Sequence, residues 1–301
     1  MLSICIPVFQ RPIQTLVDDL LQQSRSLEVE VEIILIDDAS DTEIRQKNRQ
    51  IHSEINYIQL DENIGRARIR NRFLEHASHG HLLFLDCDGL VCRDDFLKHY
   101  IDSIRSHPDK VICGGRLYPQ QEPPTAQRLR WTYGRKRESR SAAQRNTHPH
   151  QGFMTNNFVI LKSVLAAIPF DERLTDYGHE DTLMGIELRR RGVDILHIDN
   201  PILNDHLEEN DVFLMHTDKA LSNLHFIVKN TSYAEELFAD VRLLRIYRKS
   251  APLRFILGPL FRVLSPMIRR SLAEGSSSLL HFDLYRLGML QETFRLGADS
   301  E

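Results

Sequence analysis

The chain has 301 residues, of which 42% are hydrophobic and 27% are charged, as in ordinary soluble globular proteins. Its formal net charge of −4 gives no general attraction for nucleic acid, so we expect no nucleic-acid partner. None of the four cysteines forms a C-x-x-C pair, which favours reduced thiols in a cytoplasmic protein. Because no apolar run approaches the roughly 20 residues that cross a bilayer, the sequence predicts no membrane-spanning helix.

Apolar strands alternate with helices over the N-terminal part of the chain. The predicted strands cover residues 2–9, 31–40, 55–60, 81–88 and 110–118. The predicted helices cover residues 13–25, 42–52, 65–77 and 94–107. Strands that are apolar almost throughout are typical of parallel sheets with both faces covered, so the pattern indicates an α/β fold with a mostly parallel sheet flanked by helices. Ligands bind such sheets at the carboxyl ends of the strands.

The pattern changes after the fifth predicted strand. Residues 119–150 contain many arginines without regular spacing, which predicts a flexible basic loop. Order returns with a predicted helix over 181–192 and predicted strands within 193–206. From about residue 211 the pattern is helical, so we expect a helical C-terminal region over 211–301.

Two aspartates close the predicted strand over 81–88, in the stretch "HLLFLDCDG". Because strand side chains alternate, Asp86 and Asp88 would share one face, where two like charges repel each other unless a cation lies between them. A divalent cation would satisfy this arrangement. A carboxylate that caps the following helix explains one such acid, but it explains less well why Asp37 and Asp38 also close a predicted strand.

Several motifs occur together in a familiar order. The stretches "IPVFQRP", "LIDDASDT", "ENIGRARIRN" and "LFLDCD" resemble, in sequence and spacing, the family-2 glycosyltransferases of the GT-A fold. Further on, "FDERLTDYGHEDTLMGIELRRRG" is similar to the F-D-E…G-x-E-D…R-x-x-x-G segment of galactosyl- and N-acetylgalactosaminyl-transferring members. The chain departs from the family pattern at Gln10, where Asn is common, and at Ile69, where a small residue is usual.

The resemblance covers about residues 2–210 and implies how this part of the chain is divided. It implies a Rossmann-like GT-A domain over 1–210, with a nucleotide-sugar-binding half over 1–118. The flexible loop over 119–150 would follow, and then an acceptor-binding half over 151–210. The basic loop could serve as a lid over diphosphate or acceptor.

The resemblance also implies a set of donor-binding residues. They would hold the uracil edge, approach the diphosphate, contact the ribose or a metal-bound water, and lie under the donor sugar. In chain order these residues are Pro7, Phe9, Arg11, Asp38, Gly65, Arg66, Arg70, Asp86 and Gly115. A glycine lets backbone approach a phosphate closely, and arginine matches its charge. The alternative for Arg66 or Arg70 is a solvated helix face.

A metal site is implied at Asp88, with His206 as a second ligand after the last predicted strand. Carboxylate ligands suit Mn²⁺ or Mg²⁺, and an imidazole beside them favours Mn²⁺. One of 14 histidines is in general more often an ordinary surface or core residue than a ligand.

The resemblance assigns the chemistry to the acids at the start of the predicted helix over 181–192. Asp181 would be the general base that deprotonates an acceptor hydroxyl, and Glu180 would hold the acceptor. Asn156 and Asn157 could line the same acceptor pocket. The alternatives are helix capping for the acids and buried turn positions for the amides.

The C-terminal region has an unusual charge distribution. Residues 241–273 contain eight basic side chains and no acid, interleaved with "FILGPLF" and "VLSPMI". Such a basic, apolar and proline-containing segment fits helices that lie on an anionic membrane surface. A packed helical subdomain or a homodimer contact is the alternative.

These observations predict an inverting, metal-dependent glycosyltransferase that moves a sugar from a nucleotide donor, UDP-linked by resemblance, to a hydroxyl of a glycan or lipid-linked acceptor. The expected setting is cell-surface polysaccharide or lipopolysaccharide synthesis, in the cytoplasm or peripheral on the inner face of the cell membrane. One rival is a haloacid-dehalogenase-like phosphatase, because "DCDG" resembles its D-x-D-G-T motif, although the threonine is missing. A non-catalytic sugar-nucleotide-binding protein is the other rival.

Overall fold

The computed structural model describes residues 1–175 and 177–299, and these residues form two compact units. The first unit contains residues 1–119, 138–175 and 180–206. The second contains residues 120–137, the short segment 177–179 and the region from Leu207 onward. Each unit is described by itself below.

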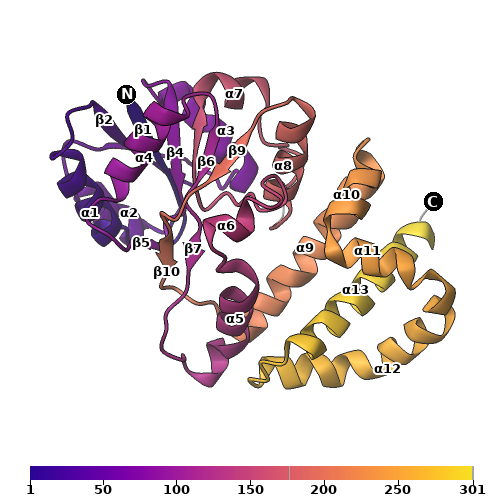
Figure 1. The fold of residues 1–301 in the computed structure, drawn as a ribbon. Coiled ribbons are helices and arrows are strands. Elements are labelled where there is room, and N and C mark those ends of the chain that lie inside the picture. Colours follow the sequence, from indigo (N-terminus) through magenta and orange to yellow (C-terminus); the bar gives the residue numbers. More distant parts are fainter. Residues whose placement is uncertain (176, 300–301) are drawn as a thin grey trace. The chain divides into compact units, whose positions relative to one another are not determined.

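A seven-stranded sheet forms the centre of the first unit (Figure 1). Its strands in spatial order are β3 (Asn56–Gln59), β2 (Val31–Asp37), β1 (Leu2–Val8), β4 (His81–Leu85), β8 (Asn157–Leu161), β6 (Val111–Cys113) and β9 (Ile195–His197). Only β8 runs antiparallel to its neighbours; the other pairs are parallel. The prediction of a mostly parallel sheet flanked by helices is therefore confirmed.

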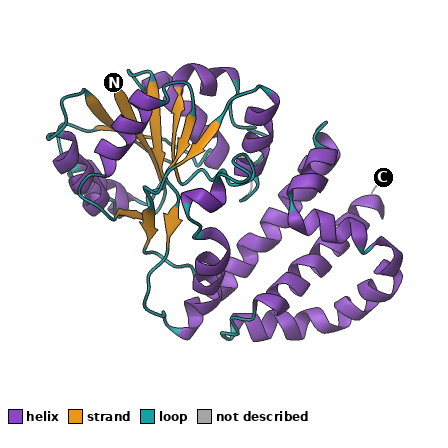
Figure 2. Ribbon diagram, viewed as in Figure 1, coloured by secondary structure: helices purple, strands orange, loops and turns teal. Residues whose placement is uncertain are grey.

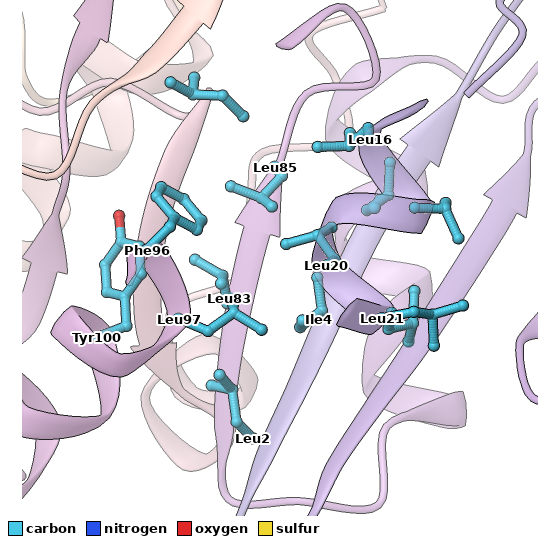
Figure 3. Close-up of a cluster of buried hydrophobic side chains, with 14 of the residues drawn as sticks. Leu2, Ile4, Leu16, Leu20, Leu21, Leu83, Leu85, Phe96, Leu97 and Tyr100 are labelled. Atoms are coloured by element: carbon cyan, nitrogen blue, oxygen red, sulfur yellow. The ribbon is translucent and has the colours of Figure 1, made fainter. Parts of the chain in front are cut away.

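Helices cover both faces of this sheet. The helices α1 (Gln14–Ser24) and α4 (Phe96–Ser106) share one hydrophobic cluster with β1 and β4. In Figure 3, Leu16 and Leu20 of α1 point into the same space as Leu83 and Leu85 of β4. The helices α3 (Arg66–His76), α7 (Lys162–Ala167) and α8 (Glu180–Arg190) contribute to a second cluster on the opposite face, and α2 (Thr42–Arg49) connects β2 to β3. The apolar spacing in the sequence reflects this two-sided burial.

A smaller sheet continues from the carboxyl ends of the main strands. It consists of β5 (Gly89–Val91), β10 (Ile202–Asn204) and β7 (Arg116–Leu117), with β10 in the centre. Each of these strands follows a main-sheet strand within a few residues: β5 follows β4, β7 follows β6 and β10 follows β9. The turns between the two sheets therefore bring polar residues from three chain segments to one edge.

The described part of the second unit consists of helices and connecting loops, without a strand (Figure 2). Its elements are η1 (Thr125–Gln127), α5 (Arg128–Tyr133), η2 (Gly134–Glu138), α9 (Asn210–Asn230), α10 (Ala234–Asp240), α11 (Arg242–Lys249), η3 (Ala251–Leu253), α12 (Arg254–Ala273) and α13 (Leu279–Asp299). Four of them, α5, α9, α12 and α13, share a core of six buried residues: Leu129, Phe213, Leu214, Leu272, Phe282 and Tyr285. The predicted helical C-terminal region is confirmed.

The prediction of a flexible basic loop over 119–150 is wrong in its structure. This segment contains η1, α5, η2 and α6 (Ala142–Arg145). Leu129 lies in the core of the second unit, and its backbone N–H donates to the Asn210 side chain. The guanidinium of Arg130 packs over the ring of Phe213. Because these helices are short and are held by single apolar and cationic side chains, they leave no periodic pattern in the sequence.

The prediction that no segment could span a membrane is also wrong by length and composition. Residues 251–273 form one helical segment with a mean hydropathy of 1.3 over its most apolar window, and only 6% of that window is buried. Pro259 and Pro266 lie inside α12 and do not end it. A proline in a helix removes one backbone hydrogen bond and can bend the helix without stopping it. Length and composition alone do not place this helix in a membrane.

Candidate functional site

The two acids of "DCD" lie in a turn rather than on a strand. Strand β4 ends at Leu85, and the backbone N–H of Gly89 donates to the carbonyl of Asp86 at 3.2 Å. A side chain at position 89 would meet Ile202, so glycine lets β10 approach here. The argument that strand alternation places Asp86 and Asp88 on one face is therefore wrong, because the chain has already turned toward β5.

Three arginines surround the Asp86 carboxylate. Arg70 Nη2 lies 2.9 Å from Asp86 Oδ1, Arg116 Nη2 lies 3.5 Å from Oδ2, and Arg66 Nη2 lies 3.6 Å from Oδ2. Burial alone would raise the pKa of Asp86, but the three guanidinium groups hold that pKa below its usual value. The sequence predicted a cation beside the paired acids. At Asp86, arginine side chains supply that positive charge.

Arg70 is almost fully buried, at 1% exposure, and its guanidinium packs over the ring of Phe170. A solvated helix face is therefore excluded for Arg70. Arg66 is half-buried, with 40% of its side chain exposed, and keeps one side open to solvent. The contact of either arginine with a diphosphate stays a prediction. Of the two, Arg66 has the side chain that a ligand could reach from solvent.

Asp88 has a different environment from Asp86. Its Oδ2 accepts a hydrogen bond of 3.1 Å from Asn204 Nδ2 at the end of β10. Asn204 is buried, and its Oδ1 has no hydrogen-bond partner among the described residues. The Asp88 carboxylate, oriented by the Asn204 amide, offers the kind of hard oxygen ligand that suits Mn²⁺ or Mg²⁺.

The protein supplies few ligands at this place. Within residues 1–175 and 177–299, no group of three or more His, Cys, Asp and Glu side chains has a metal-binding arrangement. A cation that takes most of its ligands from substrate phosphates and water needs only one or two protein oxygens. The residues present fit such a cation. His206 is exposed two residues beyond Asn204, and its assignment as a ligand stays a prediction.

The acids of "GHED" begin α8, and one of them is joined to the arginine group. Arg66 Nε donates to Glu180 Oε1 at 2.8 Å, and Arg70 Nη1 lies 4.0 Å from the same oxygen. Burial alone would raise the pKa of Glu180, but Arg66 and Arg70 hold it below its usual value. Arg66 therefore bridges Asp86 after β4 to Glu180 on α8.

Asp181 is shifted in the opposite direction. Burial and the neighbouring charge of Glu180 raise the pKa of Asp181 to about 6, although the backbone N–H of Thr182 donates to its Oδ1 at 2.7 Å. The two adjacent acids thus have separated proton affinities. A carboxylate with a raised pKa, beside one fixed by arginine, can accept a proton near neutral pH. Capping of the helix by Glu180 or Asp181 does not by itself explain this difference.

Asp38 is held by the chain segment that leads into α3. Its Oδ1 accepts from the Ile64 N–H at 2.7 Å, and its Oδ2 accepts from the Gly65 N–H at 3.2 Å. Gly65 has a φ of 83°, a conformation that glycine adopts most readily. Burial, partly offset by these two bonds, raises the pKa of Asp38. Its carboxylate therefore fixes the approach to α3, and its contact with uracil stays a prediction.

The end of β1 lies beside the end of β2. The Gln10 N–H donates to Ser40 Oγ, and the Asp38 N–H donates to the Val8 carbonyl. Gln10 and Ala39 both have positive φ, at 52° and 62°. Three donor-binding residues were predicted near here: Pro7 and Arg11 are partly buried, and Phe9 is 48% exposed. Their donor contacts stay predictions.

The glycines before β7 allow neighbouring protein atoms to pack closely against the backbone. A Cβ on Gly115 would lie 2.6 Å from Arg145 Nη2, and a Cβ on Gly114 would meet Asn200 and Tyr100. Arg145 is buried and donates to the carbonyls of Cys113, Gly114 and Ile198. The added Cβ contacts show that neighbouring protein atoms fill the space beside Gly115, and its predicted place under the donor sugar stays a prediction.

The two predicted acceptor amides differ. Asn157 is 1% exposed; it accepts from Tyr100 Oη and donates to the carbonyls of Gly115 and Asn200. Its amide is occupied within the fold, as the alternative of a buried amide predicts. Asn156 is also buried, but its Nδ2 has no hydrogen-bond partner in the described part of the chain, and its carbonyl accepts from the Asp86 N–H.

Sequence reasoning missed four residues at this edge: Arg116, Glu138, Arg145 and Asn204. Arg116 is largely but not fully buried, with 13% of its side chain exposed. Burial would lower its pKa, but Tyr118, Glu138, Asp88 and Asp86 raise it. Its Nη1 lies 3.7 Å from Glu138 Oε2. The signal for Arg116 was an arginine directly after the paired glycines, and for Asn204 an asparagine at the end of a strand. Glu138 and Arg145 lie in a segment without apolar periodicity, so no sequence pattern indicated them.

Comparison with known proteins agrees with this architecture. Residues 3–165 match the family described as glycosyl transferase family 2. No curated protein matches the chain.

Solved structures resemble the fold at low identity. Residues 1–349 of TarS from S. aureus are 17% identical over 98% of this chain and 91% of that chain, with a TM-score of 0.52. The mannosyltransferase PcManGT from Pyrobaculum calidifontis, in complex with GDP-Man and Mn²⁺, is 12% identical over 98% of this chain and 86% of its own, with a TM-score of 0.57. Glucosyl-3-phosphoglycerate synthase from Mycobacterium tuberculosis, in complex with Mn²⁺, UDP and phosphoglyceric acid, is 14% identical over 75% and 77%, with a TM-score of 0.50. These likenesses concern the fold alone.

Proposed function

The chain belongs to glycosyl transferase family 2, and we propose that it transfers a sugar from a UDP-linked donor to a hydroxyl of a glycan or glycolipid acceptor, with inversion at the anomeric carbon. One observation carries the proposal: the bridge that Arg66 forms between Asp86 and Glu180. The bridge joins the turn after β4, the proposed donor site, to the acids of α8 through one side chain. This arrangement supports a donor site and a proton acceptor on the same edge of one unit.

Asp181 is the proposed general base. With its pKa raised to about 6, it is ionised at neutral pH and still basic enough to accept a proton. As the acceptor oxygen forms its bond to the anomeric carbon, the hydroxyl proton passes to Asp181. The bond from that carbon to the diphosphate oxygen breaks on the opposite face, and UDP leaves with the electron pair. A single displacement of this kind inverts the anomeric configuration.

Glu180 and Asp86 have supporting roles in this proposal. Glu180 stays ionised because of Arg66, and it orients the acceptor by accepting a hydrogen bond from one of its hydroxyls. Asp86 holds three arginines in place and contacts the donor ribose. The partly exposed guanidinium of Arg66 then faces the leaving diphosphate.

Asp88, Asn204 and His206 are the proposed holders of Mn²⁺ or Mg²⁺. The support is the hydrogen bond between Asp88 and Asn204 and the unpaired amide oxygen of Asn204 among the described residues. Two of the structural neighbours were solved with Mn²⁺. When bound, such an ion offsets the negative charge that develops on the departing diphosphate.

The proposed donor is UDP-linked because TarS and glucosyl-3-phosphoglycerate synthase were solved with UDP or UDP-GlcNAc, whereas PcManGT was solved with GDP-Man. The proposed setting is cell-surface polysaccharide or lipopolysaccharide synthesis at the inner face of the cell membrane, which rests on family analogy. The phosphatase alternative is not favoured, because Asp86 would have to act as a nucleophile while three arginines pair with it.

Donor hydrolysis tests this function before an acceptor is known. UDP- and GDP-sugars would be screened with Mn²⁺, with Mg²⁺ and with a chelator, and UDP release would be measured. We expect UDP to be released from a UDP-sugar only when the divalent ion is present.

The metal role of Asp88 is tested by substitution. The variant Asp88→Asn should lose UDP affinity in the presence of Mn²⁺, measured by calorimetry. The control Asp109→Asn, which changes an exposed aspartate before β6, should not. Unchanged UDP affinity in folded Asp88→Asn would remove the metal role of Asp88. Trapping of an aspartyl-phosphate at Asp86 would instead support the phosphatase.

A further inference from the structure

The second unit exposes a row of large apolar side chains on one helix. Six residues of η3 and α12 are more than half exposed: Leu253, Phe255, Ile256, Leu260, Val263 and Met267. Phe255 is 76% exposed and Val263 73%. Isolated exposed apolar residues are ordinary, but a run of them on one element marks an interaction surface.

Five of these residues form one face of the helix because of their spacing. Leu253, Ile256, Leu260, Val263 and Met267 follow one another at intervals of three or four residues, which keeps them on one side. The opposite side of α12 packs on α9 and α13. There Leu272 is fully buried, and a side chain at Gly258 would meet Gln291. The helix is therefore already covered on one side and uncovered on the apolar side.

The segment that carries this face is basic. Residues 241–273 contain eight arginines and lysines and no acid. Arg248, Arg262, Arg269 and Arg270 form ion pairs, and their partners are acids from outside that segment. Arg242, Arg245 and Lys249 of α11 are exposed beside these pairs in the chain. A second copy of the same surface would bring like charges together, whereas an anionic surface would be attracted.

We propose that the apolar face of α12 lies in the headgroup layer of an anionic membrane, with the helix axis parallel to the membrane plane and the basic residues of α11 and α12 at the lipid phosphates. The length and composition of residues 251–273 would also suit a spanning helix. A spanning orientation would take the packed side of α12 into the hydrocarbon together with its partners, and these include Asp218 on α9 and Glu292 on α13. Charged side chains in that position are strongly unfavourable. An in-plane helix leaves them in water and buries only the apolar face.

The test is co-sedimentation of the full chain with vesicles. Vesicles of phosphatidylcholine mixed with phosphatidylglycerol would be compared with vesicles of pure phosphatidylcholine. We expect binding to the anionic vesicles at about 0.1 M salt and release at about 1 M, where the screening length falls from about 10 Å to about 3 Å. The triple variant Phe255→Ser, Val263→Ser, Met267→Ser should bind at least about tenfold more weakly, because it removes the inserted apolar groups.

Two further variants separate this surface from general effects. The control Met215→Ser, Leu296→Ser removes exposed apolar side chains of α9 and α13 and should bind as the unaltered protein does. The variant Arg245→Gln, Lys249→Gln removes only charge and should lose the preference for anionic lipid, which keeps the test decisive if the triple variant does not fold. No catalytic activity enters these measurements, so a failure of the proposed transferase chemistry leaves them unaffected.

Three kinds of result would overturn the proposal. The first concerns binding itself: either the unaltered protein does not sediment with anionic vesicles, or the folded triple variant binds them equally well. The second is a requirement for detergent to extract the protein from vesicles at high salt, which would indicate a spanning helix. The third is a dimer, seen by sedimentation equilibrium without lipid, that the triple variant abolishes, which would identify a second copy as the occupant.

Discussion

The two units differ in which side chains they bury and which they expose. The first unit buries charge: Arg70, Asp86, Arg116 and Glu180 have low exposure, and each of them lies beside an opposite charge. The second unit exposes apolar surface, most of all along α12. Burying ions and exposing hydrocarbon both disfavour folding when considered alone. Each unit therefore carries a feature that stability does not explain, and we connect the first with catalysis and the second with a membrane surface.

The largest expected effect separates the two acids of α8. Asp181→Asn should reduce kcat by about 10²-fold to 10⁴-fold while leaving donor affinity unchanged, because it removes the proton acceptor of the transition state. Glu180→Gln should mainly raise the KM for the acceptor. Both variants would be measured for kcat, acceptor KM and donor affinity. Near-normal kcat in folded Asp181→Asn, together with an inactive Glu180→Gln, would reverse the two roles.

The next effect concerns the buried guanidinium of Arg70. Arg70→Met should lower the free energy of unfolding by about 3 kcal/mol, because Asp86 loses its closest buried partner and keeps only Arg66 and Arg116. Urea denaturation measures this change as a lower midpoint. The matched control is Arg68→Met on the same helix, where an exposed arginine lies 3.8 Å from Glu172. It should change stability by less than about 0.5 kcal/mol. Equal effects of the two variants would show that the buried network adds no stability.

A pair of glycines tests the close contact behind the site. Gly115→Ala places a Cβ 2.6 Å from Arg145 Nη2, at a φ of 94°. Arg145 cannot shift easily, because it is buried and bonded to three backbone carbonyls. We expect a loss of about 2 kcal/mol or more. Gly192→Ala also has a positive φ, of 70°, but the added Cβ meets no described atom within 4 Å. It should lose about 1 kcal/mol, and a loss equal to that of Gly115→Ala would contradict the role of Arg145.

The smallest expected effect is a change with pH. The pKa of Asp181 is raised to about 6, so Asp181 is protonated below that pH and ionised above it. Since the base must be ionised, the rate of transfer at limiting substrate should rise about tenfold per pH unit below 6 and become level above it. The slope of log kcat/KM against pH is the measurement. A profile that is flat between pH 5 and 7 would exclude Asp181 as the titrating base.

The sequence predicted the sheet well and the detail of the site less well. Apolar runs such as 33–36 and 82–85 identify buried strands because burial on both faces leaves no polar position within them. The same signal overextended the strand at 81–88, since the turn at Cys87 and Asp88 depends on the hydrogen bond between Gly89 and Asp86. Glu138 and Arg145 lie far along the chain from the acids that follow β4 and are positioned by tertiary contacts alone. Such partners have no periodic signal in one sequence.

The sequence also did not predict which side chains pair with the acids of the site. It identified Asp86, Asp88, Glu180 and Asp181 as a group, but not that Asp86 pairs with arginine while Asp88 pairs with Asn204. The choice depends on the three-stranded sheet, which brings β7 and β10 beside the turn after β4. The exposed face of α12 was partly foreseen as a basic and apolar segment. That its two prolines stay within one helix was not foreseen.

The anomeric configuration of the product tests the central claim most directly. Once the hydrolysis screen has identified a donor and an acceptor has been found, the transferred sugar would be examined by NMR through the proton coupling across C1 and C2. A single displacement with Asp181 as base predicts a configuration opposite to that of the donor. A product that retains the donor configuration would contradict both the inverting mechanism and the role assigned to Asp181.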